Sequence, residues 1–196
     1  MVASASGTRA VRRVAPVLGL IVAPRVLVLG DSILNQSADE VRTSLEQRGW
    51  APTVVAYGGS AIGQWTAALP GLLAEHDPSI VVVELGTNDC TDGVCPELDA
   101  QIETALDALD PAEQVLWLNV QTGPTYPQGA ERVNVALETA ASRRADVDVV
   151  DFSDEFAGHP AWLDAGGPHL TPAGQLAFAR LITDAVDRFD VETVSR

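Results

Sequence analysis

The sequence is poor in cysteine, histidine and basic residues, and each shortage narrows the range of functions. Of its 196 residues, 2 are cysteines and 3 are histidines, and 12 Lys and Arg stand against 27 Asp and Glu. The formal net charge of −15 opposes non-specific binding to nucleic acid and to anionic membrane surfaces. We therefore expect no nucleic-acid partner, and a substrate that is neutral or only locally charged.

The two cysteines, Cys90 and Cys95, lie together in the stretch CTDGVC. No second pair of Cys or His residues lies near them in the sequence, which argues against a zinc site. A local disulfide is the alternative, and it would favour an oxidising compartment. Closing so short a loop brings only a modest entropic gain.

The N-terminal stretch lacks an apolar run long enough to span a bilayer. The basic segment TRAVRR is followed by apolar residues 14–24, which two prolines and a glycine interrupt. This resembles a secretory signal, but no clean A-x-A cleavage site follows. Residues 1–24 thus keep two interpretations: an export signal or anchor remnant, cleaved or not, and a plain extension. The first predicts a secreted or envelope-associated protein, and the second is compatible with a cytoplasmic one.

Residues 25–196 have the composition and length of one globular domain, since 46% of the chain is hydrophobic and no repeat or linker interrupts it. Apolar runs alternate with amphipathic segments. The runs predicted as strands are 25–30, 53–57, 80–85, 115–120 and 147–152. They are nearly continuous stretches of Val, Leu and Ile, which is typical of strands covered on both faces.

The segments between these runs show helical patterns. They span residues 37–49, 96–109, 129–144 and 171–189, with a less regular pattern at 65–75 that Pro70 interrupts. Ser37 is a candidate N-cap for the first helix, and Thr171 with Pro172 for the last. Strands that alternate with helices predict a three-layer α/β/α fold, in which helices cover both faces of a five-stranded parallel sheet.

Ligands of such sheets bind outside the carboxyl ends of the strands. There the sequence has GDS at 30–32, two glycines at 58–59, GTND at 86–89 and finally His169. Ser32 is a weak nucleophile without a base, and His169 can serve as one because the unperturbed pKa of a histidine side chain lies near neutrality. The backbone N–H groups of Ser32 and Gly59 and the amide of Asn88 are candidate donors to an oxyanion.

The motifs GDS, Gly, GTND and HLTPAG, in this order, resemble those of the SGNH or GDSL hydrolases. The resemblance runs from the first predicted strand to the end of the chain. It implies a flavodoxin-like α/β/α fold and esterase, lipase or carbohydrate acyl-transfer activity. It also implies Ser32 as nucleophile and first oxyanion donor, Gly59 and Asn88 as further donors, and His169 as base. Asp31 is a motif member that would shape the turn.

The final third of the chain is most similar to SGNH domains that accompany bacterial membrane acyltransferases, which act on acyl groups of envelope glycans. One feature departs from the family pattern. An Asp usually stands three residues before the catalytic histidine, and here that position is Gly166. Either Asp164 reaches over to hold His169, or a backbone carbonyl orients it in a Ser–His dyad, or strong catalysis is lost.

The predicted function is therefore a serine esterase that forms an acyl-enzyme on carboxylic esters, glycan O-acetyl esters included. Its substrate would be a small-molecule or carbohydrate ester, and neither a metal nor an organic cofactor is implied. One alternative is a glycan O-acetyltransferase, which has the same chemistry and a sugar acceptor. The other alternative is a weakly active or non-catalytic accessory module that binds glycan.

Overall fold

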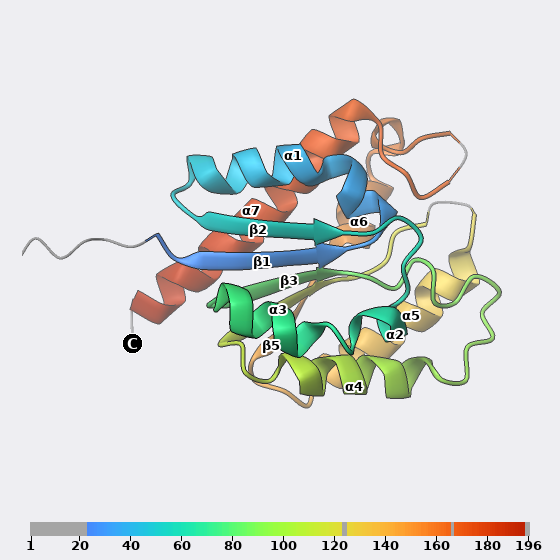
Figure 1. Ribbon diagram of the computed structural model, residues 1–196. Helices are drawn as coiled ribbons and strands as arrows, with labels where there is room; N and C mark the ends of the chain where they lie inside the picture. The colour runs from blue at the N-terminus through green and yellow to red at the C-terminus, as the bar shows by residue number, and fades with distance from the viewer. Residues whose placement is uncertain (1–22, 123–124, 166, 195–196) are drawn as a thin grey trace, which may run out of the picture.

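The computed structural model describes residues 23–122, 125–165 and 167–194, so the expected extension at 1–24 lies outside this part except for residues 23 and 24. Five parallel strands form one sheet in the order β2-β1-β3-β4-β5 (Figure 1). Their bounds are Arg25–Gly30 (β1), Ala51–Ala56 (β2), Ile80–Glu84 (β3), Gln114–Leu118 (β4) and Val147–Val150 (β5). All five predicted strands are confirmed, and the order is that of flavodoxin-like sheets.

Helices cover both faces of this sheet (Figure 1). One face carries α1 (Ser32–Gln47), α6 (Phe152–Ala157) and α7 (Pro172–Val194), with the short 3-10 helix η1 (Pro160–Trp162) before α7. The other carries α2 (Ile62–Trp65), α3 (Leu69–His76), α4 (Leu98–Leu109) and α5 (Pro127–Ala141). The predicted three-layer fold is confirmed. Within the described ranges, no helix is both long and apolar enough to cross a membrane.

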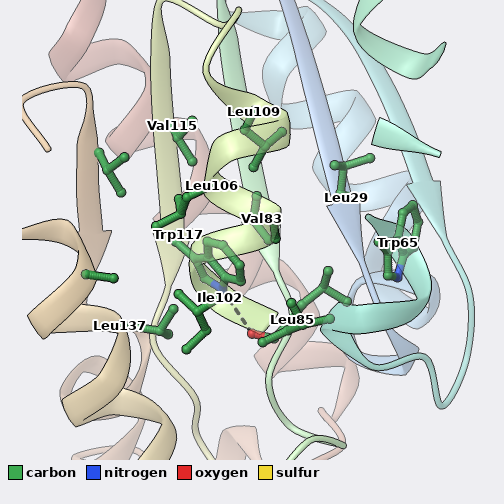
Figure 2. Close-up of a cluster of buried hydrophobic side chains, with 14 of the residues drawn as sticks. Leu29, Trp65, Val83, Leu85, Ile102, Leu106, Leu109, Val115, Trp117 and Leu137 are labelled. Carbon is green, nitrogen blue, oxygen red and sulfur yellow. Dashed lines mark hydrogen bonds between the residues drawn. The ribbon is translucent and has the colours of Figure 1, made fainter. Parts of the chain in front are cut away.

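The central strands β1, β3 and β4 are buried because each contributes side chains to two separate cores. In β1, Leu27 and Leu29 belong to the cluster under α2–α5, whereas the valines beside them face α1 and α7. Figure 2 shows the first cluster around Trp117, whose indole Nε1–H donates to the carbonyl of Leu85 at 3.0 Å. The largest buried side chain of this core thus has its polar atom satisfied.

The first helix begins five residues earlier than the sequence pattern predicted. Asp31 is its N-cap, and the Asp31 carboxylate accepts a hydrogen bond from the N–H of Ile33 at 2.9 Å. The prediction that Ser37 caps the helix is wrong, because Ser37 lies buried inside α1 and donates to the carbonyl of Ile33. Consequently Ser32 is the first helical residue, immediately after β1 and its one-residue cap.

The other helix boundaries follow the predicted signals closely. The last helix starts at Pro172, and the hydroxyl of Thr171 accepts from the N–H of Gly174 at 3.2 Å, which confirms the predicted cap. The irregular pattern around Pro70 resolves into two helices, α2 and α3. Pro70 lies in the first turn of α3, where its missing N–H removes no helical hydrogen bond.

Candidate active site

The strand order reverses at β1, which has β2 on one side and β3 on the other. In parallel sheets the crevice at such a point is the usual ligand site. The loops that leave β1, β2 and β3 meet there, at the end toward which the strand arrows point (Figure 1). The loop before α7 reaches the same end. The structure therefore brings together the four motifs that the sequence places at strand ends.

Ser32 and His169 contact each other although 137 residues separate them in the chain. The distance between Ser32 Oγ and His169 Nε2 is 3.0 Å. Ser32 is half-buried at the N-terminus of α1, where the backbone N–H groups of the first turn have no helical partner. His169 is exposed. The distance is the one that a serine nucleophile and its general base require.

The loop after β2 makes a tight turn next to Ser32. The N–H of Ser60 donates to the carbonyl of Tyr57 at 3.2 Å. Gly59 is the third residue of this turn, with φ of +76°, a conformation that favours glycine. Gly58 lies against the nucleophile, because a Cβ atom built on it would be 3.9 Å from Ser32 Cβ. The pair of glycines thus brings the backbone close to the serine.

Asn88 joins the three loops to one another. Its side-chain amide donates to the carboxylate of Asp31 at 2.9 Å and to the carbonyl of Ser60 at 3.0 Å. These partners belong to the loops after β1 and β2, and Asn88 itself follows β3. Asn88 is thereby joined in one network to Asp31 and Ser60, the chain neighbours of the other two predicted oxyanion donors, Ser32 and Gly59.

Beneath this network lies Glu84, a buried carboxyl group that the sequence reasoning missed. Glu84 is 3% exposed, and its Oε2 atom accepts from the N–H groups of Asp31 and Leu34, at 3.2 Å each. A Cβ atom on Gly30 would come within 2.8 Å of the same oxygen, so the nucleophile turn can approach Glu84 only with glycine there. A single Glu within the apolar run IVVVEL was the signal that could have revealed it.

The Asp31 and Glu84 carboxyl groups share a buried position. Burial, and then the charge of Asp31, raises the pKa of Glu84 well above its usual range. Burial also raises the pKa of Asp31, whereas the N–H of Ile33 and the nearby His169 charge favour its ionised form. The proton of this pair therefore resides on Glu84. The charge of the pair lies on Asp31, close to the histidine.

Asp89 ties the loop after β3 to the start of α2. Its two carboxylate oxygens accept from the N–H of Ile62 at 3.0 and 3.2 Å. Burial raises the pKa of Asp89 to about 6, despite this hydrogen bond. Asp89 therefore links the loop that carries Asn88 to the N-terminus of α2.

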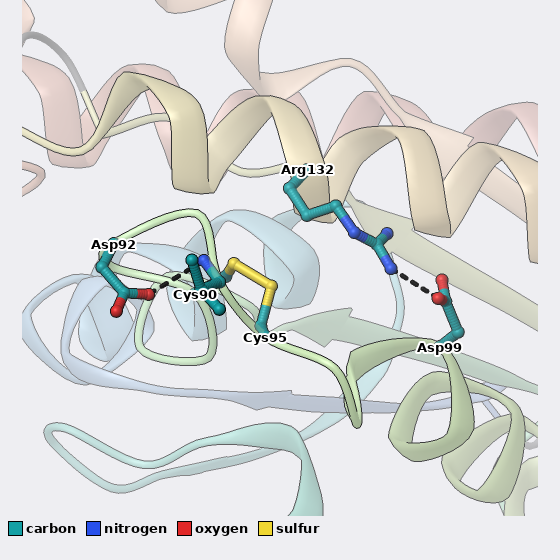
Figure 3. The surroundings of a disulfide bond; sticks show 6 residues. Cys90, Asp92, Cys95, Asp99 and Arg132 are labelled. Atoms are coloured by element: carbon teal, nitrogen blue, oxygen red, sulfur yellow. Dashed lines mark hydrogen bonds and ion pairs between the residues drawn. A yellow bond between two sulfur atoms is a disulfide. The ribbon is translucent and has the colours of Figure 1, made fainter.

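The predicted disulfide is confirmed between Cys90 and Cys95, with Cα atoms 5.4 Å apart. Figure 3 shows the bridge beside α5, where an ion pair between Arg132 and Asp99 joins α5 to α4. The closed loop packs tightly on α5, since a Cβ atom on Gly129 would fall 1.6 Å from the carbonyl oxygen of Cys90. The disulfide thus shapes the segment directly after Asn88 and Asp89.

His169 is held by its backbone. The N–H of Asp164 donates to the carbonyl of His169 at 2.7 Å, and a single antiparallel bridge lies one residue further out. The Asp164 carboxylate is exposed and accepts from the N–H of Ala165 at 2.8 Å. In the part of the chain that the structure describes, no hydrogen bond joins this carboxylate to the imidazole. Gly166 lies outside the described residues.

The chain is similar to known proteins both in sequence and in structure. The sequence profile of the GDSL-like Lipase/Acylhydrolase family matches residues 28–177. The chain is 31% identical to Esterase TesA of Pseudomonas aeruginosa over 166 residues, which are 78% of this chain and 83% of that protein. It is 32% identical to Peptidoglycan O-acetyltransferase OatA of Listeria monocytogenes over 111 residues, 56% of this chain and 16% of that protein. The crystal structure of TesA superposes with a TM-score of 0.68 at 27% identity and covers 81% of this chain and 95% of that one.

Proposed function

Because the chain belongs to the GDSL-like lipase/acylhydrolase family and is a hydrolase of the esterase type, we propose that it cleaves carboxylic esters through an acyl-enzyme on Ser32. The observation that carries this proposal is the distance of 3.0 Å between Ser32 Oγ and His169 Nε2. At this separation the imidazole can take the hydroxyl proton as the oxygen attacks.

The reaction has two halves. Ser32 Oγ attacks the ester carbonyl carbon while His169 Nε2 takes the proton. The tetrahedral intermediate then expels the alcohol, which receives that proton, and the acyl group stays on Ser32. Water attacks the acyl-enzyme with His169 again as base, and collapse of the second intermediate releases the carboxylic acid and restores the serine.

Three donors surround the place where the oxyanion forms. The N–H of Ser32 lies in the first turn of α1, where the helix dipole favours negative charge. The N–H of Gly59 comes from the turn beside it. In the free protein the amide of Asn88 donates to Asp31 and to the carbonyl of Ser60. An oxyanion can accept the hydrogen bond that Asn88 otherwise donates to the carbonyl of Ser60. The amide then donates to a charged acceptor in place of a neutral one, and this hydrogen bond is stronger.

The contacts support a Ser–His dyad over a triad completed by Asp164. The Asp164 carboxylate has Ala165 as its hydrogen-bond partner, and its link to His169 runs through the backbone. Asp31 supplies a negative charge near His169, since the positive charge of His169 favours the ionised form of Asp31. This charge would stabilise the imidazolium that forms during acylation.

A second candidate function is transfer of the acyl group to a sugar hydroxyl in place of water. Its support is the similarity to OatA, which is named as a peptidoglycan O-acetyltransferase. The chain spans 16% of that protein's length, so the similarity concerns one part of it. Mass spectrometry of a reaction with p-nitrophenyl acetate and a muropeptide acceptor distinguishes the two, since a transferase yields the acetylated sugar and a hydrolase yields acetate.

We also propose that the protein works outside the reducing cytosol, in a secreted or envelope-associated form. The support is the Cys90–Cys95 disulfide, a type of bond that persists mainly in oxidising compartments. Trapping free thiols in cells with a maleimide reagent tests this, because a disulfide-bonded protein stays unmodified.

Labelling with a fluorophosphonate probe tests the catalytic assignment directly. We expect wild type to be labelled and Ser32→Ala to be unlabelled, because the probe traps an activated serine. The exposed Ser142→Ala variant is the control and should label like wild type. An unlabelled wild-type protein that still binds glycan would instead support the accessory module.

A further inference from the structure

A cavity of about 380 Å³ lies along the outer edge of the sheet, between β2 and the helices α2 and α3. We call it the β2-edge pocket. Its walls include Val55 from β2 and Tyr57, the residue directly after β2. Trp65 from α2 also contributes, as do Ala68 just before α3 and Leu72 within it. At one end it reaches the turn that carries Gly58 and Gly59. The pocket is thus separate from Ser32 but adjoins the same turn.

The lining suits an uncharged, apolar ligand. Val55, Trp65 and Leu72 supply apolar walls, and none of the described residues that line the pocket is charged. The indole Nε1–H of Trp65 already donates to Ser60 Oγ at 2.9 Å, so the ring offers its apolar surface. Tyr57 is 63% exposed and packs against Trp65 in a tilted arrangement, with 5.3 Å between the ring centroids. An aromatic side chain that is exposed at the mouth of an apolar pocket indicates a ligand site.

The two glycines lie between this pocket and the nucleophile and place no side chain there. Gly58 lines the pocket, and its backbone also abuts Ser32, since a Cβ atom there would be 3.9 Å from Ser32 Cβ. A Cβ atom on Gly59 would meet no atom within 4 Å. A group bound covalently to Ser32 that extends across this turn would therefore meet no side chain of the turn's two glycines.

The layers of the fold decide which half of an ester would take this path. His169 reaches Ser32 from the loop before α7, which covers one face of the sheet. The β2-edge pocket lies on the opposite face, in the layer of α2 and α3. The departing alcohol must lie near His169, which protonates it. The acyl group is then the part of the ester directed toward the turn and the pocket.

We propose that the β2-edge pocket binds the hydrocarbon chain of the acyl group, and that the enzyme prefers medium-length acyl chains to acetyl. This inference rests on the proposed function, in which the acyl group is transferred to Ser32. The volume of about 380 Å³ lies within the range of small-ligand sites, which is more than an acetyl group needs.

The test uses a pair of adjacent alanines. Ala68 is exposed at the N-terminus of α3 and lines the pocket, whereas Ala67 is also exposed and does not line it. We expect Ala68→Phe to lower kcat/KM for p-nitrophenyl octanoate by about tenfold, because the phenyl ring occupies the space of the chain. The same variant should keep kcat/KM for p-nitrophenyl acetate within about twofold, and Ala67→Phe should change neither value. Urea unfolding verifies that both variants are as stable as wild type.

A binding arm separates this proposal from the proposed function. Calorimetry of p-nitrophenyl octanoate with Ser32→Ala measures binding without turnover, and adding Ala68→Phe should weaken it by about tenfold. If Ser32→Ala still hydrolysed p-nitrophenyl octanoate, the assignment of Ser32 as the nucleophile would be refuted. The effect of Ala68→Phe on octanoate binding would still test the pocket. An Ala68→Phe variant that left both octanoate binding and the ratio of octanoate to acetate activity unchanged would overturn the pocket proposal.

Discussion

Ser32 and His169 meet at 3.0 Å, but the two sides of this contact are built differently. On the serine side, the buried residues Asp31 and Glu84 hold the turn, and Asn88 connects this turn to the neighbouring loops. On the histidine side, the exposed imidazole stands on a loop fastened by backbone hydrogen bonds. Buried polar groups cannot replace a lost hydrogen-bond partner with water. The serine side therefore has one stable arrangement.

This difference indicates where the site is preorganised. Electrostatic stabilisation of an oxyanion depends on donors that are already in place. Of the proposed donors, Asn88 is exposed, but hydrogen bonds to the buried residues Asp31 and Ser60 hold its amide. The base needs only to reach the serine, and its loop can be held by backbone alone. Substitutions on the two sides should therefore differ in the size of their effects.

Loss of the imidazole should be far more damaging than loss of the nearest carboxylate on its loop. We expect His169→Ala to lower kcat/KM for a p-nitrophenyl ester by about 10³-fold or more, because the serine loses its general base. Asp164→Ala should lower it less than about threefold, since that carboxylate contacts Ala165 rather than the ring. A loss near 10⁴-fold in Asp164→Ala would give Asp164 the orienting role and exclude the dyad.

On the serine side, Asn88→Ala should lower kcat by about 10² to 10³-fold with little change in KM, because one oxyanion donor is removed. Asn35 is a matched control, as it is also exposed and follows Ser32 by less than one helical turn. Asn35→Ala should keep wild-type kinetics. A rise in KM at constant kcat in Asn88→Ala would show that Asn88 binds the ground state instead.

The buried network predicts a contrast between two replacements of Glu84. Glu84→Ala leaves the N–H of Leu34 without its side-chain acceptor, so the free energy of unfolding should fall by about 2 to 3 kcal/mol. Glu84→Gln keeps a neutral acceptor of the same shape, so its cost should stay below about 1 kcal/mol. Urea unfolding measures both. Equal losses in the two variants would mean that the ionised form of Glu84 is needed.

The smallest effect concerns pH. The pKa of Asp89 is raised to about 6, so its contribution to stability is full at low pH and is lost as pH rises through 6. Asp89→Asn removes this loss and keeps an oxygen for the N–H of Ile62. From pH 4.5 to 7, its stability relative to wild type should rise by about 1 kcal/mol, a value discounted for solvent exposure. A difference that does not change with pH would contradict the raised pKa.

Much of this fold was predictable because its signals are local. The strands are continuous Val, Leu and Ile runs, and such runs are expected where helices cover both faces. The start of α1 was not predicted, since residues 32–36 carry no strong helical pattern and the cap, Asp31, sits inside the GDS motif. Glu84 was missed for another reason. Its role depends on N–H groups about 50 residues away, which no local pattern reveals.

By itself the sequence determined the order of strands and helices, the motifs at the strand ends and the identity of the serine, asparagine and histidine. Only the tertiary structure decided how His169 is held, which carboxyl groups lie beneath Ser32 and where a cavity lies beside the turn of Gly58 and Gly59. The reason is physical. Periodicity and caps act between neighbours in the chain, whereas a 3.0 Å contact between residues 137 apart exists only after α1 and α7 have packed on the same face of the sheet.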